Sequence, residues 1–152
     1  MEEFKASRVY EITGVKRNRL QVWMERGWIT PSIEEASGHG TRNVFNRKDL
    51  YFIAMFKELV ARGLPRKTIG AFFSSIMGHY HQMSDSVIEG IEYWFFGRSG
   101  GQLRADAIFS DNIDEPISIF LQENHVKGSG FYDDLYFINF RKIREKVDLK
   151  AG

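Results

Sequence analysis

The segment GVKRNRLQVWMERGWI, residues Gly14–Ile29, decides the interpretation of this chain. Behind the opening glycine comes a polar, cationic run, Lys16-Arg17-Asn18-Arg19, and then large apolar side chains at helical spacing: Leu20, Trp23 and Met24. Apolar residues at i, i+3 and i+4 predict a helix, here from about Lys16 to Arg26, that is buried along one side. Cations are unfavourable in the first turn of a helix, close to its positive dipole end. The run therefore indicates a surface that meets a polyanion.

Short elements flank this helix on both sides. Ser7 can cap a preceding helix from about Arg8 to Thr13, and Gly14 is placed to end it. After Gly27, Pro31 opposes a further helix and Ser37-Gly38-His39-Gly40 is rich in turn residues. We expect a β-hairpin here, with strands at Ile29–Glu35 and Thr41–Phe45.

Two longer helices follow the expected hairpin. Asn46 and Asp49, three residues apart, resemble a capping box at the start of a helix from Arg47 to Ala61 or Arg62, which Gly63 ends. Pro65 then suits the first turn of a fourth helix. Its apolar residues follow the helical period: Ile69, Phe72, Phe73, Ile76, Met77 and Tyr80. Helix, turn, helix, hairpin and two more helices make up a winged helix-turn-helix, whose second helix enters the DNA major groove.

The C-terminal half predicts a different kind of unit. The segments IEYWFF, LRADAIFS, PISIFLQE and LYFI are strand-like, turn-rich glycine segments separate them, and Asn139 can cap a last helix. A single long helix over Asp134–Val147 is the alternative for the end of the chain. We expect a mainly α protein of the α+β class, with a DNA-binding domain over residues 1–81 and an α+β domain with an antiparallel sheet over 82–152.

Composition and charge fit this division. The 152 residues are 43% apolar and 27% charged, with no cysteine, which excludes disulfides and thiolate metal sites. No apolar run approaches the roughly 20 residues of a membrane span, and the N-terminus lacks a signal-peptide pattern, so we expect a cytoplasmic, nucleoid-associated protein. Residues 1–81 carry 13 Lys/Arg against 8 Asp/Glu, whereas residues 82–152 carry 8 against 12. A basic half joined to an acidic half favours nucleic acid as the partner of the first, although chance scatter of surface charge is the alternative.

About half of the chain, Ser7–Tyr80, resembles the MerR-type transcriptional regulators. The resemblance is carried, in order and with the expected gaps, by Thr13-Gly14-Val15, Leu20 and Trp23, Gly27-Trp28-Ile29, Pro31, Gly40-Thr41-Arg42 with Phe45, Asp49-Leu50, and ARGLPRKTI before the fourth helix. It implies a bacterial regulator, a homodimer that binds double-stranded DNA and distorts promoter DNA.

The same resemblance implies three groups of DNA-binding residues. The second helix would present Lys16, Arg17, Asn18, Arg19 and Gln21. The wing would present Thr41, Arg42 and Asn43, and the start of the fourth helix would bring Arg66 and Lys67 to a phosphate. Arg47 and Lys48 are weaker candidates, because the exposed face of the third helix must be polar in any case.

The chain departs from the family pattern in two places. Members usually carry a Tyr-Tyr pair where this chain has Val22-Trp23, so Val22 either touches a thymine methyl group or faces a partner. Members also continue into a long helix that forms a coiled coil between subunits. Here glycines interrupt any heptad run after Tyr80: Gly90, Gly97 and Gly100-Gly101.

We find no pattern that points to an enzyme, a cofactor or a metal. His79 and His81 lie two apart on a helix and so point to different faces, which disfavours a shared metal ion. The many aromatic residues of the C-terminal half fit a small apolar effector pocket, a sheet core or a dimer interface. Two other functions remain open: an excisionase-like protein that bends DNA, and a small-molecule or protein-interaction module that has lost DNA binding.

Overall fold

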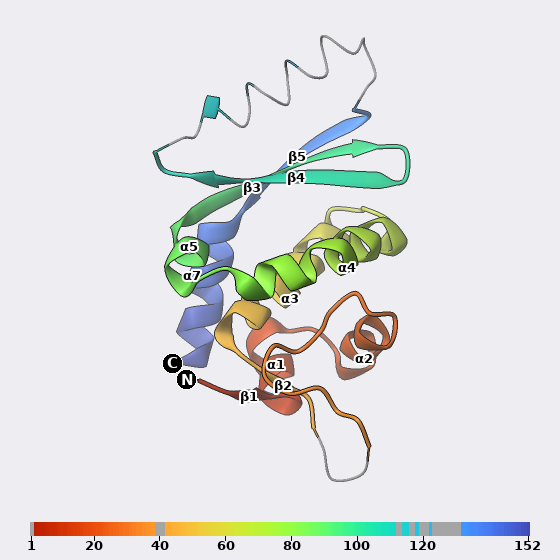
Figure 1. Ribbon diagram of the computed structural model, residues 1–152, viewed down its shortest axis with the longest axis vertical. Helices are drawn as coiled ribbons and strands as arrows, with labels where there is room; N and C mark the ends of the chain where they lie inside the picture. The colour runs from red at the N-terminus through yellow and green to blue at the C-terminus, as the bar shows by residue number, and fades with distance from the viewer. Residues whose placement is uncertain (1, 39–41, 112–113, 116–117, 119–121, 123–131) are drawn as a thin grey trace. The chain divides into compact units, whose positions relative to one another are not determined.

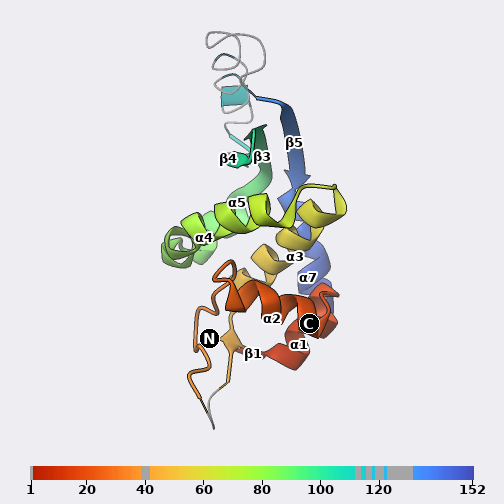
Figure 2. The same cartoon turned by 90° about the vertical axis from the view of Figure 1, so that its right-hand side faces the viewer.

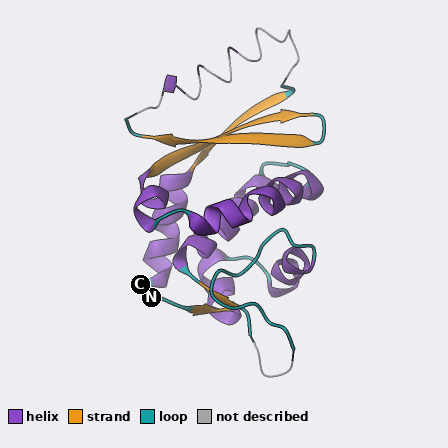
Figure 3. Ribbon diagram, in the orientation of Figure 1, coloured by secondary structure: helices purple, strands orange, loops and turns teal. Residues whose placement is uncertain are grey.

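The computed structural model describes residues 2–38, 42–111, 114, 115, 118, 122 and 132–152. The chain forms two compact units: Met1–Met83 with Ile143–Gly152, and Ser84–Lys142. Six helices and two antiparallel sheets make the described part a mixed α and β fold (Figures 1 and 3). No helix in the described ranges has both the length and the apolar character needed to cross a membrane. The division differs from the expected one, since the last ten residues group with the N-terminal unit.

The first unit contains two short helices near its N-terminus, α1 (Ala6–Thr13) and α2 (Arg17–Glu25). Ser7 does not cap α1, because the helix already begins at Ala6 and Lys5 takes the cap position without a side-chain hydrogen bond. Gly14 ends α1 as expected: its φ of 72° is left-handed, and its N–H donates to the carbonyl of Tyr10 at 3.0 Å. A three-residue turn therefore joins the two helices.

The expected hairpin is reduced in the described residues to a few hydrogen bonds. Val44 pairs with Glu34 in an isolated antiparallel bridge, with N–H to O distances of 2.8 and 3.2 Å. Instead of a longer ladder with Ile29–Glu35, β2 (Val44–Phe45) pairs with β1 (Phe4–Lys5) at the N-terminus. The prediction missed β1, because a two-residue strand has no periodicity to detect. The segment's tip, residues 39–41, lies outside the described residues.

Two long helices complete the core of this unit, α3 (Arg47–Ala61) and α4 (Arg66–Gln82). The capping box at Asn46 and Asp49 is present as predicted, and each side chain accepts a hydrogen bond from the other residue's backbone N–H. Phe52 is fully buried and stacks on Tyr80 and Phe73, with ring centroids 3.6 and 4.8 Å apart. The apolar faces of α3 and α4 therefore form the centre of the unit.

Trp28 lies against α4 at a position that only glycine permits. A Cβ atom at Gly70 would lie 2.2 Å from the indole ring of Trp28, which also stacks near Phe56 at 6.0 Å. Trp28 is half-buried, whereas Trp23, Phe45 and Phe52 are buried.

The last helix, α7 (Phe140–Ala151), contributes its later turns to the first unit. Asp148 accepts hydrogen bonds from the hydroxyl of Tyr51 at 2.6 Å and from the guanidinium of Arg47 at 2.9 Å. Arg8 in α1 donates to the carbonyl of Lys150 at 3.0 Å. The first unit is thus assembled from both ends of the chain.

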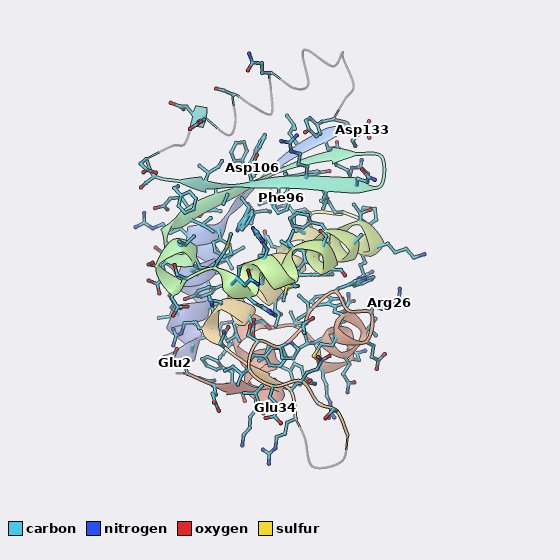
Figure 4. The ribbon with its side chains drawn as sticks, in the orientation of Figure 1. Glu2, Arg26, Glu34, Phe96, Asp106 and Asp133 are labelled. Atoms are coloured by element: carbon cyan, nitrogen blue, oxygen red, sulfur yellow. The ribbon has the colours of Figure 1, made fainter. Side chains whose placement is uncertain are left out.

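Among its described residues, the second unit contains α5 (Asp85–Gly90) and a three-stranded sheet. Ser84 caps α5 through its hydroxyl, which accepts from the N–H of Val87 at 3.3 Å. The strands β3 (Ile91–Ser99), β4 (Gln102–Phe109) and β5 (Asp134–Asn139) lie in the order β4-β3-β5, all antiparallel. Phe96 belongs to the central strand (Figure 4) and is fully buried.

Three strand predictions and the final helix can be compared with this sheet. IEYWFF, LRADAIFS and LYFI fall on β3, β4 and β5, and the Oδ1 of Asn139 accepts from the N–H of Lys142 at the start of α7. The alternative of one helix from Asp134 is wrong, because β5 occupies that segment. Most of PISIFLQE lies outside the described residues.

Candidate nucleic-acid interface

The turn between α1 and α2 is held by hydrogen bonds at its corner. The hydroxyl of Thr13 donates to the carbonyl of Val9 at 2.8 Å and accepts from the N–H of Val15 at 3.2 Å. Thr13 and Val15 are both buried, so the chain enters α2 from a fixed point. Figure 2 shows α1 and α2 next to each other beside α3.

The buried side of α2 orients the helix. Leu20 is fully buried, and the indole of Trp23 stacks on Phe56 of α3 with ring centroids 4.0 Å apart. Stacked aromatic pairs add about 0.5–1.5 kcal/mol to the stabilisation that comes from burial alone. Two anchors three residues apart fix the rotation of a nine-residue helix, and therefore fix which residues it exposes.

The exposed side of α2 carries all five residues predicted there: Lys16, Arg17, Asn18, Arg19 and Gln21. None of its three cations forms an ion pair within the described ranges. Val22 joins this face with 41% of its surface exposed. The helix therefore presents cations, hydrogen-bonding side chains and one exposed valine, the groups that protein–DNA contacts use.

The residues predicted on the wing have different environments. Arg42 is exposed, whereas Asn43 is half-buried and its Oδ1 accepts from the N–H of Ala36 at 3.0 Å. Asn43 thus holds the backbone at Ala36, a contact that the sequence pattern did not predict. Thr41 lies outside the described residues. Glu34, which pairs with Val44 next to Asn43, is labelled in Figure 4.

Arg66 and Lys67 are the first two residues of α4, and both are exposed. Arg47 and Lys48, at the start of α3, are engaged within the protein. The guanidinium of Arg47 binds Glu2 at 2.7 Å as well as Asp148, and Nζ of Lys48 donates to the carbonyl of Met83 at 2.8 Å. The hydrogen bond from Arg47 lowers the pKa of Glu2. These contacts explain why the cations at the start of α3 differ from those of α2.

A buried carboxylate fixes the base of the segment between α2 and β2. Asp49 is 1% exposed and accepts hydrogen bonds from the N–H of Ser32 at 2.9 Å, from the Ser32 hydroxyl and from the N–H of Asn46 at 3.1 Å. Burial raises the pKa of Asp49, while these hydrogen bonds oppose the rise. Nε2 of His81 in α4 lies 3.6 Å from the same carboxylate. The sequence identified Asp49 only as a helix cap, because Ser32 lies 17 residues away.

A helix-turn-helix whose second helix exposes cations is one of the arrangements that DNA-binding domains use. Residues 4–76 match the family described as "MerR HTH family regulatory protein". The N-terminal half of the chain is thus similar to the MerR family, as its sequence predicts, and this similarity points to a DNA-binding transcription regulator. No curated protein matches the chain.

Proposed function

We propose that this protein is a sequence-specific DNA-binding transcriptional regulator that reads duplex DNA with α2. The observation that carries the proposal is the exposed side of α2, with three cations and two amides on a helix that Leu20 and Trp23 orient. Arginine and lysine reach guanine edges or phosphates, and asparagine and glutamine pair with adenine. The MerR family match over residues 4–76 supports the same function.

The remaining contacts of the proposed interface come from two other segments. Residues 29–45 act as a wing, with Arg42, Thr41 and Asn43 near the DNA backbone. Arg66 and Lys67 bind a phosphate, supported by their exposure at the N-terminal end of α4, whose dipole favours anions. The protein then acts in the bacterial cytoplasm, associated with the nucleoid, where its DNA lies.

The C-terminal unit has the second role in the proposal, which is to join two copies of the chain and to bind a small apolar effector. Two large apolar side chains of β5 support a homodimer: Leu135 is 39% exposed and Phe137 is 44% exposed. They lie two residues apart on β5, the outer strand of the sheet as far as the chain is described, so they share one face of that sheet. A dimer would read two related half-sites, which is the arrangement of palindromic operators.

Selection of bound duplexes from a random pool tests sequence specificity, and affinity for the selected duplex tests the residues. Contact with about six phosphates predicts a slope of log K against log salt of about −5. The double substitution Arg17→Ala/Arg19→Ala should weaken binding at least tenfold and, where both residues contact phosphates, reduce the slope by about two. Fluorescence anisotropy at several salt concentrations measures both quantities.

The matched control is Lys142→Ala/Lys146→Ala, which removes two exposed cations from α7. This variant should bind the selected duplex within about twofold of the unchanged protein, since Lys142 and Lys146 belong to none of the proposed contacts. A slope near zero, or equal affinities of the α2 variant and the control, would refute the proposal. A bound pool without a consensus would favour a DNA-bending protein without sequence specificity.

A further inference from the structure

A hollow of about 250 Å³ lies between the α1–α2 turn and α3. The turn contributes Gly14, Val15 and Lys16, α2 contributes Arg19 and Trp23, and α3 contributes Lys57, Val60 and Ala61. All eight residues belong to the first compact unit. The site is therefore distinct from the C-terminal unit, to which the effector role is proposed above.

The walls of this hollow are predominantly apolar. Val15 and Trp23 are each 3% exposed, and the Trp23 ring is held against Phe56, so this wall is preformed. Small-molecule sites combine such walls with a few polar groups that fix the orientation of the ligand. An inorganic anion alone, or a DNA phosphate, would leave these walls without a partner.

The polar groups of the hollow all have the same sign. Lys16, Arg19 and Lys57 line it, and none of the eight lining residues is acidic. Nζ of Lys57 lies 3.4 Å from the carbonyl of Thr13, which keeps the ammonium at the mouth of the turn. Gly14 leaves room for it, since a Cβ there would lie 2.7 Å from this nitrogen.

The start of α2 adds to the positive potential. Lys16 occupies the N-cap position and makes no side-chain hydrogen bond to the first turn, so no capping oxygen neutralises the helix end. Cationic side chains and an uncapped helix terminus next to an apolar wall suit one kind of ligand. Its body is flat and apolar, and one end carries a carboxylate.

We propose that this hollow binds a small aromatic carboxylate, with the ring on the wall of Trp23, Val15 and Val60 and the carboxylate at Lys57 and Lys16. Lys16 and Arg19 are also in the proposed DNA-reading face of α2. The ligand and DNA therefore cannot bind at the same time. This mutual exclusion rests on the proposed function. The ligand acts as an effector inside the DNA-binding unit.

The test titrates 2-naphthoate into the full-length ¹⁵N-labelled protein at constant ionic strength. The backbone amides of Gly14 and Val15 and the Trp23 indole N–H should shift together with a saturating curve. The neutral analogue 2-naphthalenemethanol should bind at least tenfold more weakly, because it lacks the charge. Absence of shifts at these three groups, or equal binding of the two compounds, would overturn the site.

Two substitutions test the roles of the charge and of the space. Lys57→Met keeps the length of the side chain and should weaken naphthoate binding at least fivefold; Ala61→Trp fills the hollow from α3 and should abolish it. Lys146→Ala is the control, since Lys146 is exposed on α7, does not line the hollow and should leave naphthoate binding unchanged. If either folded hollow variant retained the affinity of the unchanged protein, the assignment would be refuted.

Competition separates this inference from the proposed function. Saturating naphthoate should raise the apparent Kd for the selected duplex at least fivefold, whereas the alcohol should not. If the protein binds naphthoate but no DNA, the proposed function is refuted and the ligand site still stands. DNA binding without naphthoate binding would refute the site alone, and simultaneous binding of both would refute the exclusion.

Discussion

At the scale of single residues, Asp49 links parts of the chain that are distant in sequence. Its carboxylate caps α3, binds Ser32 below the proposed wing, and lies beside His81 near the end of α4. Loss of one partner of a buried hydrogen-bonded group costs about 1–3 kcal/mol. The position of the segment after α2 thus depends on one ionisable group.

Comparison with Asp49→Asn should reveal a pH-dependent contribution of Asp49 to stability. Burial raises the folded-state pKa of Asp49 above its ordinary value of 3.8, so the folded protein takes up a proton here before the unfolded chain does. The free energy of unfolding of the unchanged protein should therefore rise relative to that of the variant as the pH falls through the raised pKa. The gain should level off below 3.8, where the unfolded chain is protonated too.

Urea unfolding of both proteins at pH 7, 5 and 4 measures this difference. The asparagine side chain does not titrate, so its own stability provides the reference at each pH. If the difference in unfolding free energy between the two proteins stays constant over this range, or shrinks as the pH falls, the raised pKa of Asp49 is contradicted.

At the scale of the elements, the sequence of α7 predicts a helix but does not predict which part of the fold the helix packs against. Its apolar positions Phe140 and Val147 are buried, yet helical spacing alone cannot say which unit the helix covers. Hydrogen bonds from Tyr51 and Arg47 to Asp148 attach its later turns to α3. Tyr51 is only 3% exposed, and its hydroxyl donates to this carboxylate.

Replacing Asp148 with Ala should destabilise the first unit by about 1–3 kcal/mol, because its carboxylate accepts hydrogen bonds from the Tyr51 hydroxyl and the Arg47 guanidinium. Lys146→Ala, on the exposed side of the same helix, is the matched control and should change the free energy of unfolding by less than about 0.5 kcal/mol. Chemical unfolding followed by tryptophan fluorescence measures both values. Equal effects of the two substitutions would show that α7 does not depend on this contact.

At the scale of the whole molecule, the chain leaves the first unit after Met83 and returns to it at Ile143. The charge differs between the halves, with an excess of cations over residues 1–81 and of carboxylates over 82–152. Charge separation of this kind directs one part of a protein toward a polyanion and keeps the other part away from it. This charge distribution suits the proposed regulator, in which the basic part binds DNA and the other unit joins two copies of the chain.

The proposed homodimer predicts that a charge on the edge strand weakens self-association. Leu135→Lys places an ammonium on the exposed face of β5, and edge lysines oppose pairing between strands of different molecules. Sedimentation equilibrium should show at least a tenfold increase in the dimer dissociation constant. Leu149→Lys is the control, since Leu149 is 85% exposed on α7 and should leave association unchanged. If the protein without substitutions is monomeric, the proposed homodimer is refuted.

Much of the fold and the exposed part of the site could be predicted from the sequence. Helical periodicity gave α2, α3 and α4 to within a residue or two, because each buries a regular apolar stripe. The cations Lys16, Arg17 and Arg19 cluster in the first turn of the predicted helix, and all three are exposed in the structure. The match of residues 4–76 confirms the MerR resemblance.

The sequence by itself thus determined the helix-turn-helix and the cationic run at the start of α2, since helical spacing and turn residues such as Gly14 mark where the two helices lie. Only the tertiary structure decided which distant groups meet: β1 with β2, Ser32 with Asp49, α7 with α3, and Lys57 with the turn after α1. Local periodicity records which face of an element is buried, but not which element covers it. That choice depends on packing and hydrogen bonds between residues far apart in the chain, which no local pattern contains.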